Sequence, residues 1–565
     1  MTKPCIKADL RARPYRLDDA AVAWVEETLA AMGTEERIRQ VFAPLAPSTN
    51  EQYLQEWVTK YQPGAVMFRP APKAELKQAA AVLQQNSAVP LLVAGNLEDG
   101  GNGFAEDGTY YGKPLQVAAT GDPAFARELG RIAGLEAAAA GANWAFAPIV
   151  DLDLNWRNPI TNVRTFGSDT DTVIAMSRAY KQGFEQSGGV VSVKHFPGDG
   201  TDERDQHLHV TFNSLPVAEW MESYGRIYRS LIEDGAHTVM AGHIAFPAYL
   251  INKGAQEKAA TPATLSPELL QHLLRGELGF NGMIVTDATP MIGFAASAPR
   301  EEAIPAALAA GCDMILFNRD YTEDLAFMRR GVEQGVVTAE RLEDAVRRIL
   351  GVKAAAGLHL QQGKDSGIPL EAIGSAGHAH SARTMADHAV TLVRDRDALL
   401  PLTPDKYRRI FLMPLGTDAG DRCIRQFAGL LEAGGFQVEV QDLKEYRFDK
   451  VSQPLQSMKD RYDLAIYAAV ERTSSNRTQV RLNYSPMVAI NAPWFAQEVP
   501  SLAVSFANPY HLLDMPFIST YINAYADSEA TVHAVAAQLT GQAPFKGKHP
   551  VDAYCGNRWD LHIYD

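Results

Sequence analysis

The pattern of apolar and polar positions repeats one rhythm from about residue 62 to residue 317. A short apolar run is followed by a polar or glycine-bearing stretch, and then by a longer segment with helical periodicity. Short, nearly continuous apolar runs are typical of parallel strands buried on both faces, and their alternation with helices predicts βαβ units. The predicted strands are 65–68, 91–94, 144–150, 190–193, 238–241, 283–286 and 314–317.

Helices are predicted between these strands. The one near residue 266 begins with Ser266, followed by Pro267 and Glu268, a typical start of a helix. The predicted helices are 122–139, 170–186, 217–233, 266–275 and 339–350.

Seven strands at this spacing favour a (β/α) barrel of about eight strands, one of them irregular or hidden. A doubly wound open sheet is the alternative.

A second α/β unit is predicted after residue 380. A stretch rich in Gly, Ala and His at 357–380 breaks the periodicity and indicates a linker. Beyond it, apolar runs alternate with helices such as 422–433, which predicts an open, mostly parallel sheet with helices on both faces. The limits are a barrel at 1–355, a linker at 356–385 and a smaller α/β domain at 386–565. Its predicted strands are 390–393, 409–413, 437–440, 464–468 and 502–506.

Composition excludes several classes of protein. The 565 residues include 53 Lys+Arg and 67 Asp+Glu, a net charge of −14, and are 46% hydrophobic and 21% charged, which excludes a disordered chain and a miniature disulfide scaffold. Without a basic cluster, no nucleic-acid partner is expected. The aromatic residues of the segment 543–565 predict that it packs onto a domain. They are Phe545, Tyr554, Trp559 and Tyr564.

The cysteines and the amino end bear on the compartment. Cys5, Cys312, Cys423 and Cys555 lie far apart without a C-x-x-C spacing, which argues against a structural zinc site and a disulfide framework. Residues 1–16 lack the apolar stretch of a signal peptide, and no run approaches the roughly 18 apolar residues of a membrane span. We therefore predict a cytoplasmic protein without a membrane segment.

Reactive side chains follow the predicted strands. In a barrel, the carboxyl ends of the strands meet at one mouth, where barrel enzymes keep their chemistry. We therefore expect these side chains to share one site. They are Asn96, Glu98, Asp151, Lys194, His195, His243, Asp287 and Asn318.

The densest polar cluster is the run KHFPGDGTDERDQH at 194–207. Lys194 and His195 stand at the strand end, the proline and glycines turn the chain, and Asp205 and His207 lie two residues apart in the loop. A carboxylate beside an imidazole fixes its tautomer and favours its protonated form, which suits a general acid that later acts as a base. An isolated Asp-x-His usually belongs to an ordinary solvated loop, but the preceding KHFPG favours a catalytic pair.

Asp287 leaves the strand 283–286 within the run LGFNGMIVTDATPM at 278–291. Facing the mouth opposite the loop of Asp205 and His207, its carboxylate can be the nucleophile of a double displacement at an acetal carbon. Alternatively, Asp287 caps the following helix. The residue alone does not decide between these two.

Together these motifs resemble glycoside hydrolase family 3, and within it the β-N-acetylglucosaminidase branch. The run NWRNPITNVRTFGSD at 155–169 is similar to the family's N-P-x-x-N-x-R-x-F-G-x-D segment, and KHFPG with D-x-H is typical of that branch. TLVRD at 391–395, LLPL at 399–402 and GKHPV at 547–551 are similar to the family's second domain. The resemblance covers nearly the full length and implies a TIM-like (β/α)8 barrel followed by an α/β sandwich domain.

The resemblance also implies roles for residues. Asp287 is then the nucleophile, and His207, with Asp205 behind it, is the acid/base of a retaining exo-β-N-acetylglucosaminidase acting on cell-wall or chitin-derived sugars. Phosphate in place of water as acceptor would make the enzyme a phosphorylase, and a β-glucosidase is a further alternative. A catalytically dead sugar-binding protein would lack the nucleophile or the pair, and both are present.

Other residues match those that hold the sugar in the −1 subsite. These are Arg164, Lys194 and His195, whose charged or bidentate donors suit hydroxyl groups. For Arg164 the alternative is a structural ion pair with Asp151 or Asp169.

Two positions depart from the family pattern. The chain reads NLEDGG at 96–101 where many members have D-x-E-G-G, so Asn96, or Asp99 if the alignment shifts, is expected to bind sugar hydroxyls. Asp199 stands where the family more often has histidine, and it either adds negative charge near His207 or bonds the loop backbone. His243 in MAGHI at 240–244 either lines the pocket or supports it as a hydrogen-bonded histidine.

The partners follow from this reading. We expect a small carbohydrate substrate and neither a metal nor another cofactor, because no His, Cys or carboxylate spacing indicates a metal site. The catalytic set is complete in the barrel, so the second domain could support loops, cover the mouth or form a homodimer.

Overall fold

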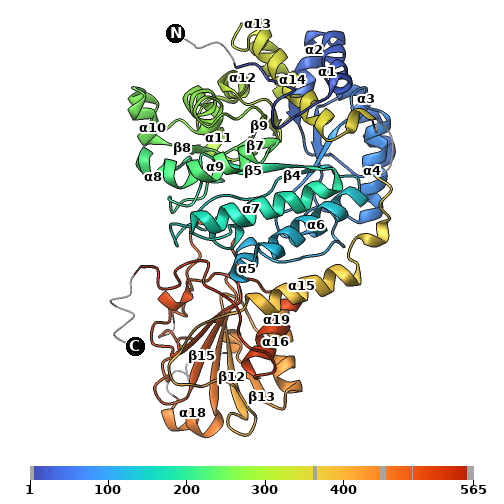
Figure 1. The fold of residues 1–565 in the computed structure, drawn as a ribbon. Helices are drawn as coiled ribbons and strands as arrows, with labels where there is room; N and C mark the ends of the chain where they lie inside the picture. The colour runs from blue at the N-terminus through green and yellow to red at the C-terminus, as the bar shows by residue number, and fades with distance from the viewer. Residues whose placement is uncertain (1–5, 361–365, 446–452, 487, 557–565) are drawn as a thin grey trace. The chain divides into compact units, whose positions relative to one another are not determined.

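The computed structural model describes residues 6–360, 366–445, 453–486 and 488–556, and these form two compact units (Figure 1). The first unit takes the chain up to residue 111, then 126–155 and 170–379. The second takes 112–125, 156–169 and the chain from residue 380 onward. This division differs from the predicted limits at 355 and 386, because two segments within the first 170 residues cluster with the second unit.

The first unit is a TIM-like barrel of parallel strands. Six strands lie in the order β2-β3-β4-β5-β7-β9, and β1 pairs with β10. Parallel bridges Leu45–Met67 and Val285–Met314 connect these two sheets on both sides, so the eight strands close into a ring. The strands are β1 (Phe42–Ala43), β2 (Ala65–Met67), β3 (Leu92–Gly95), β4 (Trp144–Ala145), β5 (Val190–Phe196), β7 (Thr238–Ala241), β9 (Met283–Thr286) and β10 (Ile315–Leu316).

Burial on both faces explains the apolar runs. Every residue of β3, β5, β7 and β9 is buried, so the usual alternation of apolar and polar positions is absent. The seven predicted strands are present, and the hidden one is β1, which has only two residues. A small parallel pair, β6 (Thr211–Phe212) with β8 (Ile244–Ala245), lies outside the ring.

Helices surround the barrel (Figure 1). α6 and α7 pack closely at Gly130 and Gly183, where a Cβ atom would lie 2.0 Å from a backbone oxygen of the facing helix. The predicted helix at 266 begins as expected, since Ser266 Oγ accepts from Leu269 N at 3.3 Å, but its turns are of the π type. The helices are α1 (Asp19–Ala31), α2 (Thr34–Gln40), α3 (Glu51–Tyr61), α4 (Lys73–Gln85), α6 (Pro123–Ala139), α7 (Thr170–Phe184), α8 (Val217–Glu222), α9 (Tyr224–Glu233), α10 (Pro247–Asn252), η6 (Glu268–Glu277), α11 (Ile292–Ala295), α12 (Arg300–Ala310), α13 (Tyr321–Glu333) and α14 (Ala339–Ala355).

The second unit is an α/β sandwich around one mixed sheet. Its order is β11-β16-β15-β14-β12-β13, parallel except for β11, which runs antiparallel to β16. The five predicted strands are present, and β16 was not predicted. The strands are β11 (Thr391–Asp395), β12 (Arg409–Leu415), β13 (Gln437–Val440), β14 (Leu464–Ala469), β15 (Ser501–Ser505) and β16 (Thr520–Asn523). The helices are α5 (Pro114–Ala119), α15 (Ala376–Ala389), α16 (Arg422–Ala433), α18 (Leu455–Arg461) and α19 (Glu529–Leu539).

Several predictions concern the ends of the chain. Phe545 and Tyr554 pack against the two apolar cores of the second unit, while Trp559 and Tyr564 lie outside the described residues.

Cys312, Cys423 and Cys555 are free thiols, and Cys5 is outside the described range. Within the described residues, no helix combines the length and apolar character needed to cross a membrane.

Candidate active site

Asp287 follows β9 at the carboxyl end of the barrel. Its backbone N–H donates to Ala241 O at 2.8 Å, which continues the ladder with β7 and fixes the residue at the strand exit. Oδ1 accepts from Ala288 N at 2.7 Å, and the side chain is 13% exposed, so the carboxylate is held yet reachable. Burial would raise the pKa of Asp287, but the electrostatic effect of the neighbouring histidines, His195 above all, and the bond from Ala288 N outweigh it and lower the pKa below the ordinary value.

His195, near the end of β5, faces Asp287. Its Nε2 lies 3.8 Å from Asp287 Oδ2, which is too long for a hydrogen bond but close enough for electrostatic attraction. Its Nδ1 lies 2.7 Å from Asp151 Oδ2, and Asp151 Oδ1 accepts from the backbone N–H groups of His195 and Asp199. Asp151 therefore fixes the ring of His195 and directs Nε2 toward Asp287.

Asp205 and His207 form the predicted pair. His207 Nδ1 lies 2.6 Å from Asp205 Oδ1, so Nδ1–H donates to the carboxylate and Nε2 is the nitrogen that can exchange a proton. Asp205 is fully buried, whereas the His207 side chain is 25% exposed. The backbone N–H of Ile292, five residues after Asp287, donates to His207 O at 2.9 Å, which ties the loop to the segment that follows Asp287.

Lys194 occupies the same mouth beside the end of β3. Its Nζ donates to Glu98 Oε1 at 2.7 Å and to Asn96 Oδ1 at 3.2 Å. Lys194 is buried and Asn96 is exposed, so the amide borders the open side of the site. Asp99 is half-buried, and its carbonyl accepts from Tyr111 N at 2.7 Å.

His243 lies behind Asp287. Its ring is fully buried, with Nε2 3.0 Å from Ala288 O and Nδ1 3.1 Å from Thr264 Oγ1. Because a carbonyl only accepts, Nε2 bears the proton, and burial lowers the pKa of His243 so that the neutral ring is favoured. This geometry fits the second of its two expected roles, support of the turn after Asp287.

Asp199 bonds the loop backbone, the second of its two expected roles. Its Oδ1 accepts from Gly200 N at 2.7 Å.

Asn318, at the end of β10, donates to Asp324 Oδ2 at 2.7 Å and so ties its loop to α13. Arg164 belongs to the second unit, in the short helix η2 (Asn162–Arg164), where Nη1 donates to Ile160 O at 3.2 Å. Its contact with a sugar stays a prediction.

Glu98 and Asp151 were expected at the mouth because both directly follow strands, but no role in catalysis or sugar binding was predicted for them. In the structure, Glu98 pairs with Lys194, and Asp151 orients His195. Gln206, between the two members of the pair, is also part of the mouth, and its place in the sequence gave no sign of this. Among the residues that the structure describes, no group of three or more His, Cys, Asp or Glu side chains is arranged to hold a metal ion.

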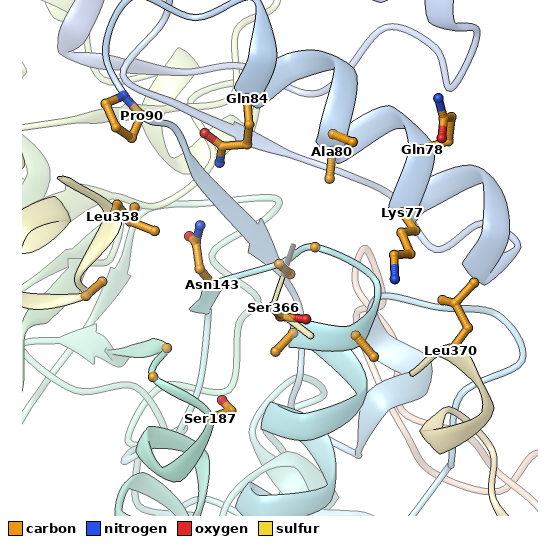
Figure 2. A pocket seen from close by; sticks show the side chains of 18 of the residues that line it. Lys77, Gln78, Ala80, Gln84, Pro90, Asn143, Ser187, Leu358, Ser366 and Leu370 are labelled. Carbon is orange, nitrogen blue, oxygen red and sulfur yellow. The ribbon is translucent and has the colours of Figure 1, made fainter. Parts of the chain in front are cut away.

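A separate cavity of about 500 Å³ lies at the opposite end of the barrel (Figure 2). Asn143 and Gly189, which line it, directly precede β4 and β5, and Pro90, also in the lining, lies two residues before β3. Two of its amides already bond the backbone, since Gln84 and Asn143 both donate to Leu91 O. The candidate catalytic residues Asp287, Asp205 and His207 do not line this cavity.

Comparison with known proteins identifies the family of the chain. The description "Glycosyl hydrolase family 3 N terminal domain" matches residues 33–352. The chain belongs to glycoside hydrolase family 3. A "Beta-N-acetylglucosaminidase/beta-glucosidase" from Cellulomonas fimi is 41% identical over 98% of this chain and 100% of its own length. This family 3 chain is accordingly a glycoside hydrolase.

Solved structures support the two-unit architecture. "Beta-glucoside phosphorylase BglX" is 42% identical, with a TM-score of 0.91, and the match covers 98% of this chain and 99% of that one. A family 3 β-N-acetylglucosaminidase from Paenibacillus sp. str. FPU-7 is 24% identical, with a TM-score of 0.78 over 93% and 99% of the two chains, and this likeness bears on the fold alone.

Proposed function

We propose that this enzyme is a retaining exo-β-N-acetylglucosaminidase with Asp287 as nucleophile and His207 as acid/base. The observation that supports it best is that the loop of His207 is bonded to the segment that follows Asp287. The charge of His207 acts on Asp287, and the bond from Ile292 N to His207 O joins their segments. Lys194, His195, Asn96 and Asp99 are the proposed sugar contacts, by their places at the mouth and by the family resemblance.

In the first step, Asp287 Oδ2 forms a bond to the anomeric carbon. The glycosidic C–O bond breaks, and its electron pair goes to the leaving oxygen, which takes the proton from His207 Nε2. The Asp205 carboxylate at 2.6 Å stabilises the imidazolium before transfer and keeps Nε2 as the donor atom. A lowered pKa of Asp287 suits this step, because the nucleophile must be ionised.

In the second step, an acceptor oxygen bonds to the anomeric carbon and the ester to Asp287 breaks. When the acceptor is water, its proton goes to His207 Nε2, which restores the acid. The two inversions leave the configuration of the sugar unchanged.

Phosphorolysis is the second candidate for this step. The imidazole is neutral once it has given its proton, so it does not repel an anion as a carboxylate would. A phosphate dianion also needs no base to attack. The phosphorylase that is 42% identical over nearly the whole chain favours this alternative.

The nucleophile can be identified by trapping. A 2-fluoro glycoside with an activated leaving group should stop the enzyme as a stable ester, and peptide mass spectrometry should locate the sugar on Asp287. A sugar on another residue, or no label in an enzyme that turns over ordinary substrates, would contradict the proposal. His237→Ala is a control, because His237 precedes β7 at the opposite end of the barrel and should not change trapping.

Product analysis then separates the acceptors and the sugars. 4-Nitrophenyl β-N-acetylglucosaminide and β-glucoside, each with and without phosphate, should show which sugar is transferred faster. Free sugar in both conditions indicates hydrolysis, and a sugar 1-phosphate formed with a faster rate in phosphate indicates phosphorolysis. The predicted cytoplasmic location and the cell-wall or chitin origin of the substrate stay predictions.

A further inference from the structure

We propose that Gln206 is a positioning residue, which holds the imidazole of His207 opposite Asp287 by anchoring its loop inside the barrel mouth. This inference rests on the proposed acid/base role of His207. The sequence places Gln206 between Asp205 and His207, in a loop rich in charged residues where an amide usually faces water.

The side chain of Gln206 is buried instead. Gln206 is 1% exposed, and its Oε1 accepts from the backbone N–H of His243 at 3.0 Å. His243 follows β7 closely, and its own ring is held by Thr264 and by Ala288 O. The amide of Gln206 therefore fastens the loop to a rigid part of the barrel, next to the turn that positions Asp287.

A second anchor lies at Gly293. A Cβ atom on Gly293 would lie 2.6 Å from Gln206 O, 2.6 Å from His209 O and 2.9 Å from the Cβ of His243. The loop thus closes directly on the backbone of residue 293, where no side chain has room. One residue earlier, Ile292 N donates to His207 O at 2.9 Å.

Between these anchors the loop is a compact turn. Asp205 Oδ1 accepts from both His207 N at 2.9 Å and His207 Nδ1 at 2.6 Å, and Asp205 O accepts from Leu208 N and His209 N. The turn can move as one piece, so loss of an anchor would preserve the pair but change its distance from Asp287. Proton transfer needs hydrogen-bond reach, and it should therefore suffer more than nucleophilic attack.

The test compares leaving groups. Gln206→Leu removes the acceptor at similar volume, and Gly293→Ala forces the loop outward. We expect kcat/KM to fall about 10- to 100-fold for aryl β-glycosides whose leaving groups need protonation, less than the roughly 10²–10⁴-fold of a complete loss of acid–base catalysis, because the pair itself is kept. For the 2,4-dinitrophenyl glycoside, which leaves without a proton, kcat/KM should stay within about twofold, since the nucleophile is untouched. On that substrate kcat should still fall, because the attack of water on the glycosyl-enzyme needs the base. Azide, which attacks without a base, should restore kcat.

Controls separate this inference from the proposed function. Gly429→Ala, in α16 with nothing within 4 Å of the added Cβ, should leave all rates unchanged. His207→Ala should show the same dependence on leaving group, more strongly; if it does not, the proposed role of His207 fails. Suppose that His207→Ala shows this dependence on the leaving group. If kcat/KM of the two anchor variants then falls equally on every substrate, the anchor is merely structural, and if it does not fall at all, the anchor is unnecessary. Either result overturns the inference. Thermal unfolding shows whether each variant is folded. If Gln206→Leu does not fold, Gly293→Ala alone tests the inference.

Discussion

The two ends of the barrel use the same residue types in opposite ways. At the carboxyl end, Asp287 is 13% exposed and His207 is 25% exposed, so charged groups reach a ligand. At the amino end, Asp313 before β10 is completely buried between arginines. Its Oδ2 accepts from Arg275 at 2.6 Å and from Ile284 N at 2.7 Å, and its Oδ1 binds Arg341.

The network at the amino end extends into α14. Arg348 and Arg341 both bind Asp344, at 2.8 and 3.2 Å, and Arg348 also donates to Asn281 O at 2.6 Å. Burial would raise the pKa of Asp344, but these guanidinium groups outweigh it and lower the pKa. The charged groups of this network are buried and paired with one another, so removing one of them should destabilise the fold, whereas the reachable groups at the other end are those proposed to act on the sugar. Variants at the two ends should therefore separate activity from stability.

The largest expected effect is on activity. Asp287→Asn keeps the shape of the side chain but removes the charge that attacks the sugar, and kcat should fall by about 10⁴-fold or more. The midpoint of thermal unfolding should change little. A variant that loses stability but keeps its rate would reverse the assignment of the two ends.

The matching change at the amino end is Asp313→Asn. It leaves Arg275 and Arg341 buried without their shared counter-charge, and the free energy of unfolding should fall by about 3–5 kcal/mol. Urea unfolding measures this, and kcat per folded molecule should equal that of the wild type. Asp19→Asn is the control, because the pair of Asp19 with Arg11 is exposed, 90% and 61%, and should have no measurable effect.

A smaller, pH-dependent effect is expected from Lys353 of α14. Burial lowers its pKa to about 7, and its Nζ donates to Gln40 Oε1 at 2.8 Å. From pH 7 to about 10 the unfolded chain holds a proton that the folded chain has lost, so stability should rise with pH by up to about 1.4 kcal/mol per unit. Lys353→Met should lack this rise when urea unfolding is compared at pH 7 and pH 9. Parallel changes in both proteins would show that Lys353 is not responsible.

The smallest expected effect is a shift in the pH dependence of kcat/KM. His195 is the leading positive neighbour that lowers the pKa of Asp287. His195→Ala should therefore raise that pKa, and the acid limb of kcat/KM should move to higher pH, because the carboxylate protonates earlier as pH falls. The alkaline limb should stay in place. His237→Ala should move neither limb, and an unmoved acid limb in His195→Ala would contradict the electrostatic role.

The fold was largely predictable because buried parallel strands leave continuous apolar runs. Strand β1 was hidden because two residues, Phe42 and Ala43, form no recognisable run. The π turns of 268–277 have no signature in the sequence, which shows helical periodicity either way. The segment 156–169 could not be assigned to the second unit, because its neighbours in sequence belong to the barrel.

At the site, Asp287, Asp205, His207, Lys194 and His195 could be found from strand ends and motif. The roles of the supporting residues could not be predicted, because a sequence pattern gives residue types but not the atoms that they contact. Glu98 and Asp151 acquired a role only through distances of 2.7 Å to Lys194 and His195.

The sequence by itself determined most of the strands, the residues at their ends and the family, because burial and local motifs leave their pattern along the chain. Only the tertiary structure decided that the ring of His243 is enclosed, that the amide of Gln206 enters the mouth and that Gly293 lies under the loop. These depend on contacts between segments distant in the chain. Such contacts arise when the ring of strands closes and brings the loops together.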